Sequence, residues 1–226
     1  DFATLGVVER PWESVELGRS GPVFGFYDVE HFEPASWSTT YPNVAFGRMT
    51  ERDAAWMARI IARIGEPELT RIVEAARFSP DLGKELVRLL MGRRRKLLER
   101  YLGRLSPLAR PALATNAGHA WLCADDVAVL AGVAGARKDS ARAWVGAAAR
   151  PLTPPQVRTH AGGQVCVALP ALPEASAEHP DYYIVELATQ DAPALPFPAR
   201  FHVYHSGQGR YLLAGVEREA SYAPPG

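Results

Sequence analysis

The chain has 226 residues, 47% of them hydrophobic, and its 25 basic residues balance its 25 acidic residues. This length supports one large domain or two small ones. A neutral chain argues against nucleic acid as the main partner, because that binding is driven by neutralising phosphates. No run of 18 apolar residues is present, so the sequence predicts no transmembrane segment.

Residues 1–48 are rich in proline, glycine and aromatic residues and show little helical periodicity. They predict an extended arm with turns, the first of them at Pro11-Trp12, and a short strand from Val23 to Val29. Four potential metal ligands crowd together in this arm: Asp28, Glu30, His31 and Glu33. Spacing alone supports a metal site only weakly, so we interpret the segment as a solvated loop and predict no metal or cofactor.

Residues 50–105 predict three successive helices. Thr50 is an N-cap residue, and Asp53 completes a capping box three positions later. The apolar stripe of the first helix contains Ala54, Met57, Ile60, Ile61 and Ile64. Asp53 points towards this apolar side, which leaves two interpretations open. It caps the helix through backbone amides, or it is a buried carboxylate paired with an arginine.

The second helix is expected to begin near Pro67, because proline is tolerated in a first turn, and to bury Ile72, Val73 and Ala76. The third begins after Ser79 and runs for about 22 residues, or roughly 33 Å at the α-helical rise.

The third helix contains Gly92, followed by four basic residues, RRRK. A glycine lowers helix propensity by about 1 kcal/mol relative to alanine, so we expect a bend or a change of packing partner there. Arg93 and Arg94 lie under apolar faces of the helix. Ion pairing, with Asp53 as a candidate partner, is the first interpretation. The alternative is a phosphate or carboxylate site formed by Arg93, Arg94 and Lys96, because guanidinium groups bind such anions bidentately.

The segment LSPLARPALATNAGHAWL is broken by prolines and predicts turns, and a short helix follows from about Ala124 to Leu130. The composition then shifts between residues 135 and 140. We therefore expect two domains, an arm with a helical domain at residues 1–136 and a small β domain at residues 137–226.

The second part predicts five or six short strands. Gly162-Gly163 indicates a hairpin between strands at 157–159 and 165–167. Residues 181–189 alternate as a strand, and residues 200–205 and 210–217 form a second hairpin. The expected fold class is therefore α+β, with a helical N-terminal region and a small antiparallel β sandwich or barrel.

Two cysteines are present, Cys123 and Cys166. Buried free thiols are the expectation, with a disulfide as the alternative. Two histidines, His202 and His205, lie three apart on a strand and therefore face opposite sides, which makes them a poor metal pair.

No nucleophile elbow, zinc-protease, phosphate-loop or dinucleotide motif is present in the sequence. No serine, histidine and aspartate stand in a recognisable nucleophile context. The sequence therefore predicts no catalytic residues.

The strings VVERPWE, SWSTTYPNVAFGRMTERDAAWMARIIARI and LVRLLMGRRRKLLERYLGRLSPL resemble the C-terminal half of a family of long, uncharacterised bacterial proteins. The resemblance covers residues 5–135 and, more loosely, the closing YLLAGVERE. It implies that the chain is the tail of a larger, exported polypeptide in the cell envelope or periplasm. The upstream halves of those proteins resemble protein kinases distantly, but this chain has no H-R-D string and no Asp-Phe-Gly.

Three functions remain open. The first is a non-catalytic module that binds another protein chain or the upstream half of its own protein. The second is the C-terminal subunit of a kinase-like phosphotransferase, in which Arg93, Arg94 and Lys96 complete a site. The third is a surface- or carbohydrate-binding β module that uses Tyr182, Tyr183, Tyr204 and Tyr211.

Overall fold

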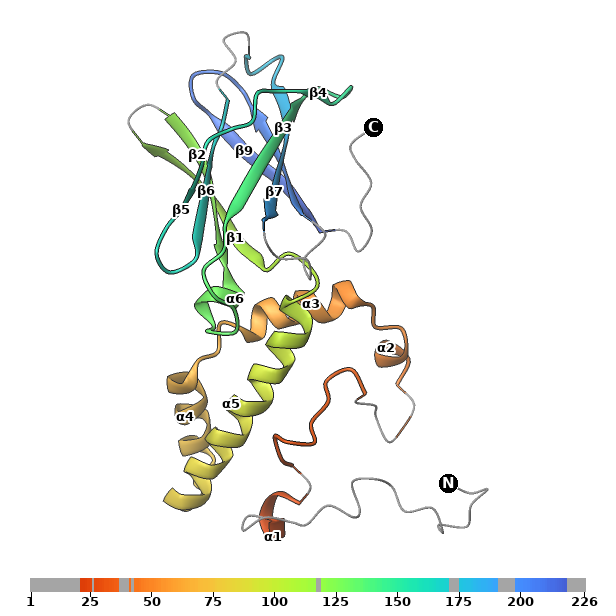
Figure 1. The fold of residues 1–226 in the computed structure, drawn as a ribbon, viewed down its shortest axis with the longest axis vertical. Coiled ribbons are helices and arrows are strands. Elements are labelled where there is room, and N and C mark those ends of the chain that lie inside the picture. The colour runs from red at the N-terminus through yellow and green to blue at the C-terminus, as the bar shows by residue number, and fades with distance from the viewer. Residues whose placement is uncertain are drawn as a thin grey trace. The chain divides into compact units, whose positions relative to one another are not determined.

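The computed structural model describes residues 21–25, 27–36, 41, 43–116, 119–170, 175–190 and 198–218 (Figure 1). The expected turn at Pro11-Trp12 lies outside these residues. Contacts divide the chain into two compact units, Asp1–Phe46 with Ile64–Leu97 and Gly47–Arg63 with Leu98–Gly226. Each unit is described by itself below.

The first unit contains α1 (Gly21–Phe24), α4 (Glu66–Ala75) and most of α5 (Pro80–Leu102). The strand expected from Val23 to Val29 is wrong. Residues 21–24 form a helical turn instead, and Gly25, with φ of +58°, ends it. A residue in this left-handed conformation interrupts the alternation that a strand would need.

Helices α4 and α5 begin where the sequence predicts. The N–H of Gly65 donates to Glu68 Oε2 at 2.9 Å at the start of α4, and α5 has 23 residues with no interruption at Gly92. The expected apolar stripe of α4 is only partly correct, because Val73 is buried whereas Ile72 is exposed.

Helix α2 (Val44–Gly47) is a single turn, and α3 (Glu51–Ile61) belongs to the second unit. Thr50 caps α3 as expected. The buried residues of α3 are Ala54, Ala55 and Ala58, whereas Met57 of the expected stripe is exposed. The packed face of α3 is therefore lined by alanines, whose small size permits close approach.

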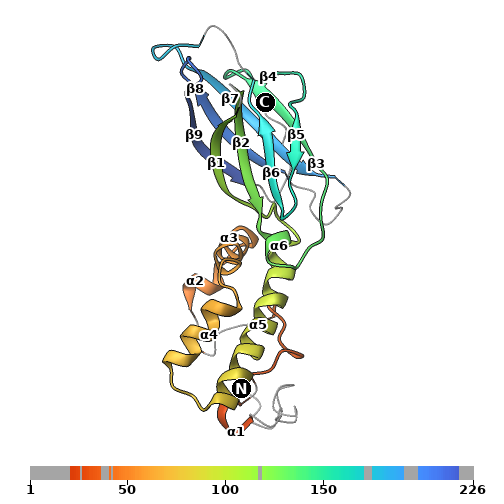
Figure 2. The same ribbon diagram turned by 90° about the vertical axis from the view of Figure 1, so that its left-hand side faces the viewer.

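The described residues of the second unit also form nine strands in two sheets. The four-stranded sheet has the order β1 (Leu108–Asn116), β2 (His119–Asp126), β6 (Gln164–Ala168), β5 (Val157–Thr159). The five-stranded sheet has the order β4 (Arg150–Pro151), β3 (Asp139–Val145), β7 (Asp181–Thr189), β8 (Ala199–His205), β9 (Tyr211–Arg218). All pairs are antiparallel. The two sheets form separate layers, so the expected α+β class is confirmed with a sandwich rather than a closed barrel (Figure 2).

The turns expected between residues 105 and 122 are wrong, because this segment contributes β1 and β2. Pro111 falls in the irregularity of β1 between Ala109 and Ala112, where no partner is registered. A proline lacks an N–H and is tolerated in a strand at such a bulge. Helix α6 is correspondingly shorter than expected, Val127–Leu130.

Strands β1 and β2 precede residue 136, and β2 pairs with β6 after it. The expected boundary between residues 136 and 137 would separate two domains that fold independently. It stays a prediction that limited proteolysis between residues 132 and 142 would test.

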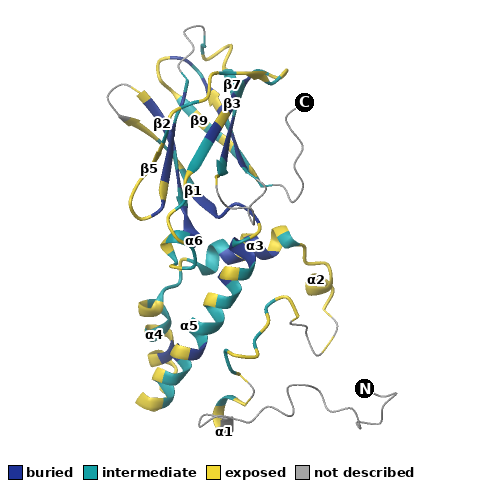
Figure 3. Cartoon of the chain, viewed as in Figure 1, coloured by how far each residue is buried: buried dark blue, intermediate teal, exposed yellow. Residues whose placement is uncertain are grey.

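The core of the sandwich lies between the two sheets, where the strands alternate as expected (Figure 3). On β7, Tyr183, Val185 and Leu187 are buried, and Phe201 and Val203 of β8 lie beside them. Both predicted hairpins are present. Gly162 and Gly163 have φ of +97° and +85°, a conformation that glycine adopts without strain.

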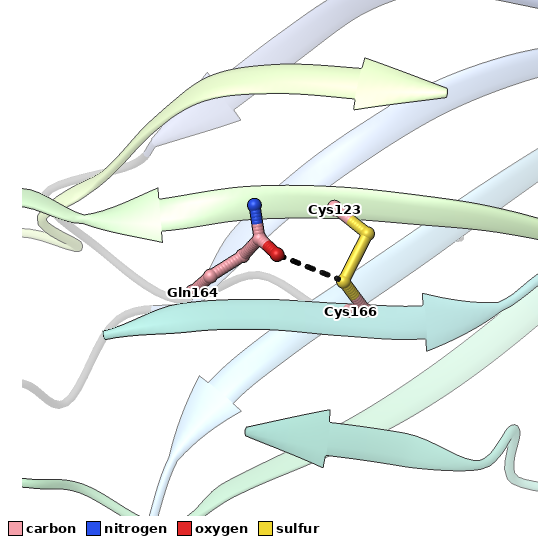
Figure 4. The surroundings of a disulfide bond; sticks show 3 residues. All are labelled: Cys123, Gln164 and Cys166. Carbon is pink, nitrogen blue, oxygen red and sulfur yellow. Dashed lines mark hydrogen bonds between the residues drawn. A yellow bond between two sulfur atoms is a disulfide. The ribbon is translucent and has the colours of Figure 1, made fainter. Parts of the chain in front are cut away.

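Cys123 of β2 and Cys166 of β6 form a disulfide (Figure 4). The two residues are direct partners in the antiparallel register, and Gln164 Oε1 lies 3.9 Å from Cys166 Sγ. The expectation of free thiols is therefore wrong. Strand register decides the pairing, and no spacing of two cysteines in the sequence reveals it.

Candidate interaction site

Asp53 is an exposed helix cap. Its N–H donates to Thr50 Oγ1 at 3.3 Å, and its Oδ2 accepts the Thr50 N–H at 2.9 Å and the Thr50 hydroxyl at 2.7 Å. The hydrogen bond from the Thr50 backbone and the one from its hydroxyl hold the pKa of Asp53 below its usual value. The capping interpretation is confirmed, and the interpretation as a buried carboxylate is wrong.

Arg93 lies between two aromatic rings of the arm. Its guanidinium carbon is 3.7 Å from the centroid of Tyr27 and 4.1 Å from that of Phe32. A guanidinium over the face of an aromatic ring is attracted by the ring quadrupole. This arginine therefore holds the arm against α5.

Lys96 holds the same segment through the backbone. Its Nζ donates to the carbonyl of Glu30 at 2.7 Å and to that of Phe32 at 3.2 Å, and it lies 3.8 Å from Glu33 Oε1. Arg94 is half-buried, and burial lowers its pKa. The structure thus brings Arg93 and Lys96 together around the arm. Anion binding by the basic run stays a prediction.

Gly92 supplies the space for this contact. A Cβ atom placed on Gly92 would come within 2.6 Å of Val29 Cγ2. The sequence change at Gly92 therefore marks a change of packing partner within a continuous helix.

Two of the four potential metal ligands of the arm, Asp28 and His31, bind each other. His31 Nδ1 lies 2.9 Å from Asp28 Oδ2, and the His31 N–H donates to Asp28 Oδ1 at 2.9 Å. Burial raises the pKa of Asp28, but the hydrogen bonds from His31 outweigh it and the pKa lies below its usual value. Within the described residues no group of three or more potential metal ligands is found.

A groove of about 740 Å³ lies between α4 and α5. Its apolar lining includes Val73 from α4, and Val87 and Met91 from α5, with Phe78 from the connecting turn. Its charged lining includes Glu66 and Glu74 from α4, and Lys84 and Arg88 from α5. The volume falls within the range of sites that bind small molecules or peptide side chains. An apolar lining with charges on both sides suits an amphipathic segment.

The sequence analysis did not single out this groove, although one signal for it exists. Glu66, Thr70 and Glu74 recur every four residues, which places them on one face of a helix. The ring of Phe24 in α1 lies 6.0 Å from that of the lining residue Phe78 in an edge-on arrangement.

Two arginines from distant segments meet in the second unit. Arg59 of α3 donates from Nη1 to the carbonyl of Ser106 at 3.5 Å, and Arg218 of β9 donates from Nη2 to the carbonyl of Leu108. Burial lowers the pKa of both, and the charge of Arg59 contributes to lowering that of Arg218 to about 10. No signal in the sequence connects residues 159 positions apart.

Two acids of the described sandwich, the buried Asp126 and the half-buried Asp139, have a raised pKa. Burial raises the pKa of Asp126, whose Oδ1 caps α6 and whose Oδ2 lies 3.3 Å from Arg137 Nη1. Burial and the charge of Asp126 raise the pKa of Asp139, which accepts hydrogen bonds from Thr159 at 3.4 Å and Thr189 at 3.1 Å. Perturbed acids attract attention as catalytic candidates, but both carboxylates here have structural partners.

The four tyrosines of the carbohydrate hypothesis are divided by the sheet. Tyr183 is fully buried in the core, and Tyr211 donates to the Pro170 carbonyl at 3.1 Å. Tyr182 and Tyr204 face outward on neighbouring strands with ring centroids 5.3 Å apart, and the Tyr182 hydroxyl is hydrogen-bonded to His202. Only two of the four therefore share a surface.

Across the part of the chain that the structure describes, no helix is long and apolar enough to cross a membrane. Comparison with models of protein families, with curated proteins and with solved structures finds no match.

Proposed function

We propose that this chain is a non-catalytic interaction module, the C-terminal part of a larger bacterial protein, and that it binds another protein chain or the upstream half of its own protein. The groove between α4 and α5 is the observation that carries this proposal. It combines an apolar lining with charged residues on both sides.

The packing of the first unit supports a binding role. Of its described hydrophobic residues, only Val73, Val87 and Leu89 are buried, whereas Ile72 and Phe78 are exposed. So few buried side chains provide little hydrophobic stabilisation, and such a unit gains stability when a partner covers its apolar surface.

The known partners of the charged residues support a non-catalytic role. Asp53 caps a helix, Lys96 donates to arm carbonyls, and Asp126 and Asp139 are held by backbone amides, an arginine and threonines. A catalytic acid or base needs a free path to a substrate atom. Each of these groups is instead bound by partners within its own chain.

The disulfide supports the proposed location in the cell envelope or periplasm. Disulfides form and persist in oxidising compartments and are rare in the reducing cytosol. The bond between Cys123 and Cys166 lies within the core sheet of the sandwich rather than on a surface loop.

A surface- or carbohydrate-binding role is the second candidate. The outward pair of the half-buried Tyr182 and the exposed Tyr204 favours it, since adjacent aromatic rings on a surface provide a stacking platform for a sugar. The pair covers a small area compared with the groove, so we place it second.

Calorimetric titration tests the non-catalytic part of the proposal. The chain is titrated with ATP and magnesium, and separately with inorganic phosphate. We expect no saturable ATP binding, and at most weak binding of both ligands that declines with salt. Magnesium-dependent ATP binding at micromolar affinity would overturn the proposal in favour of a phosphotransferase subunit.

Site-specific photo-crosslinking tests the groove. A photoreactive residue replaces Thr70, which lines the groove, or Arg71, which is exposed beside it and does not line it. We expect only the photoreactive residue at position 70 to give a discrete adduct in bacterial cells. Mass spectrometry then identifies the peptide that is crosslinked in this adduct. Equal labelling from both positions would contradict a role for the groove.

A further inference from the structure

Resting on the interaction role proposed above, we infer that the groove between α4 and α5 binds an amphipathic α-helix of a partner protein. The partner helix presents an apolar stripe to the groove and two basic residues, two turns apart, along the edge that faces α4. The partner is thus defined by its chemistry.

The length of the groove fits a short helix. The lining residues of α5 run from Pro80 to Met91, which at 1.5 Å per residue is about 16 Å. A partner helix of about 11 residues, or three turns, spans the same distance. Its apolar stripe would meet the exposed Phe78, next to the start of α5, and the half-buried Met91 further along that helix.

The acidic wall defines one edge of the partner. Glu66 and Glu74 are both exposed, with Thr70 between them on the same face of α4. Eight residues separate the two carboxylates, which corresponds to about 12 Å along the helix. Basic residues seven or eight positions apart on the partner would meet both carboxylates.

The opposite wall is basic but weaker. Lys84 is exposed, whereas Arg88 is bound by Glu85, which accepts from its Nε at 2.8 Å and its Nη2 at 2.7 Å. That ion pair compensates much of the arginine charge. The partner edge that faces α5 therefore needs one acidic residue, opposite Lys84.

A helix suits this groove better than an extended strand. The groove walls are two helices, whose main-chain groups are hydrogen-bonded internally along most of their length. A strand would find no sheet edge to pair with, so its own N–H and C=O groups would lose water without compensation. A helix satisfies these groups itself.

Peptide display tests the inference. A library of 14-residue helical peptides with a fixed apolar stripe and randomised edge positions is selected on the full chain. We expect enrichment of lysine or arginine at two edge positions seven or eight apart. The selected peptides should lose at least tenfold in affinity for the variant E66K/E74K, measured by fluorescence anisotropy.

Two controls separate this inference from other outcomes. Arg71→Glu, beside the groove, should leave peptide affinity unchanged. Replacing the two basic residues of a selected peptide with glutamate should restore its binding to E66K/E74K. Selected peptides without a paired basic edge, or with equal affinity for E66K/E74K, would overturn the inference and leave the ATP result above unaffected.

Two further measurements test whether another occupant, either a segment of this chain or a second copy of it, fills the groove. A synthetic peptide of residues 1–20 that binds more tightly than the selected peptides, and loses affinity for E66K/E74K, would give the groove to this chain itself. Sedimentation of the full chain as a dimer that E66K/E74K dissociates would give it to a second copy. We expect neither result.

Discussion

Val29 packs directly against the backbone of Gly92, so closely that a Cβ atom on the glycine would lie 2.6 Å from Val29 Cγ2 and 2.8 Å from Val29 Cγ1. The arm and α5 therefore meet at a position where only glycine leaves enough room. Arg93 and Lys96, the next residues on that side of the helix, hold the arm on either side of this contact.

Gly92→Ala tests this contact. Crowding should cost about 1–3 kcal/mol, offset by up to about 1 kcal/mol of improved helix propensity. We expect faster cleavage within residues 27–36 by limited proteolysis and a lower or unchanged free energy of unfolding in urea.

Gly83→Ala is the matched control, because its new Cβ would make an ordinary 3.5 Å contact with Val73. It should be stabilising by up to about 1 kcal/mol. Equal protection of the arm in both variants would contradict the close contact.

Lys96→Met should release the arm without disturbing α5. The substitution removes hydrogen bonds to the carbonyls of Glu30 and Phe32 but retains an apolar side chain of similar length. Because Lys96 is part-exposed, we expect a loss of about 1 kcal/mol. Hydrogen exchange should accelerate at residues 28–33 while the amides of α5 keep their protection. Arg71→Met on α4, whose guanidinium donates to Glu68 and to the Pro67 carbonyl of its own helix, should leave the arm unchanged. Loss of protection throughout α5 would instead indicate a general role in the helix.

The pH dependence of stability should show opposite contributions from two aspartates. The pKa of Asp139 is raised in the folded state, so the folded state binds more protons than the unfolded chain above pH 3.8, the ordinary value. Its contribution to stability therefore falls as the pH rises from 3.8 through the folded pKa. Asp53 has a lowered pKa, so its contribution is present above pH 3.8 and is lost as the pH falls through its folded pKa.

Melting temperature measured from pH 2.5 to pH 7 distinguishes the two. Asp139→Asn should flatten the decline above pH 3.8, and Asp53→Asn should flatten the loss below it. A profile for Asp139→Asn that parallels the unmodified chain above pH 3.8 would show that this carboxyl is not perturbed.

Removal of the disulfide should destabilise the sandwich. Cys123 and Cys166 are 43 residues apart, and a crosslink of this span contributes about 2–4 kcal/mol, mainly by restricting the unfolded chain. The double variant C123A/C166A should lower the free energy of unfolding by that amount. The same loss should follow when a reductant is added to the unmodified chain. Insensitivity of the unmodified chain to reductant, together with two titratable thiols after unfolding, would show that the bond does not form.

Local chemistry determined much of the helical region. The Thr50–Asp53 capping box, the proline at the start of α4 and the serine before α5 act within one turn of the backbone, and all three helices begin where these residues predict. Alternation likewise identified β7, β8 and β9, because the apolar residues of β7 and β8 that face the core, such as Tyr183 and Val203, alternate with polar or less buried ones.

Tertiary structure decided what these local signals do not contain. The prolines made β1 unpredictable, because the sequence does not distinguish a proline in a β-bulge from a proline in a loop. Only the partner strand decides between the two. The disulfide depended on strand register, and the meeting of Arg59 with Arg218 depended on a helix and a strand 159 residues apart. The basic run after Gly92 was recognised as unusual from the sequence. Its contact with the arm followed only from the packing of Val29, Tyr27 and Phe32, since the partner of a charged residue is set by distance in space.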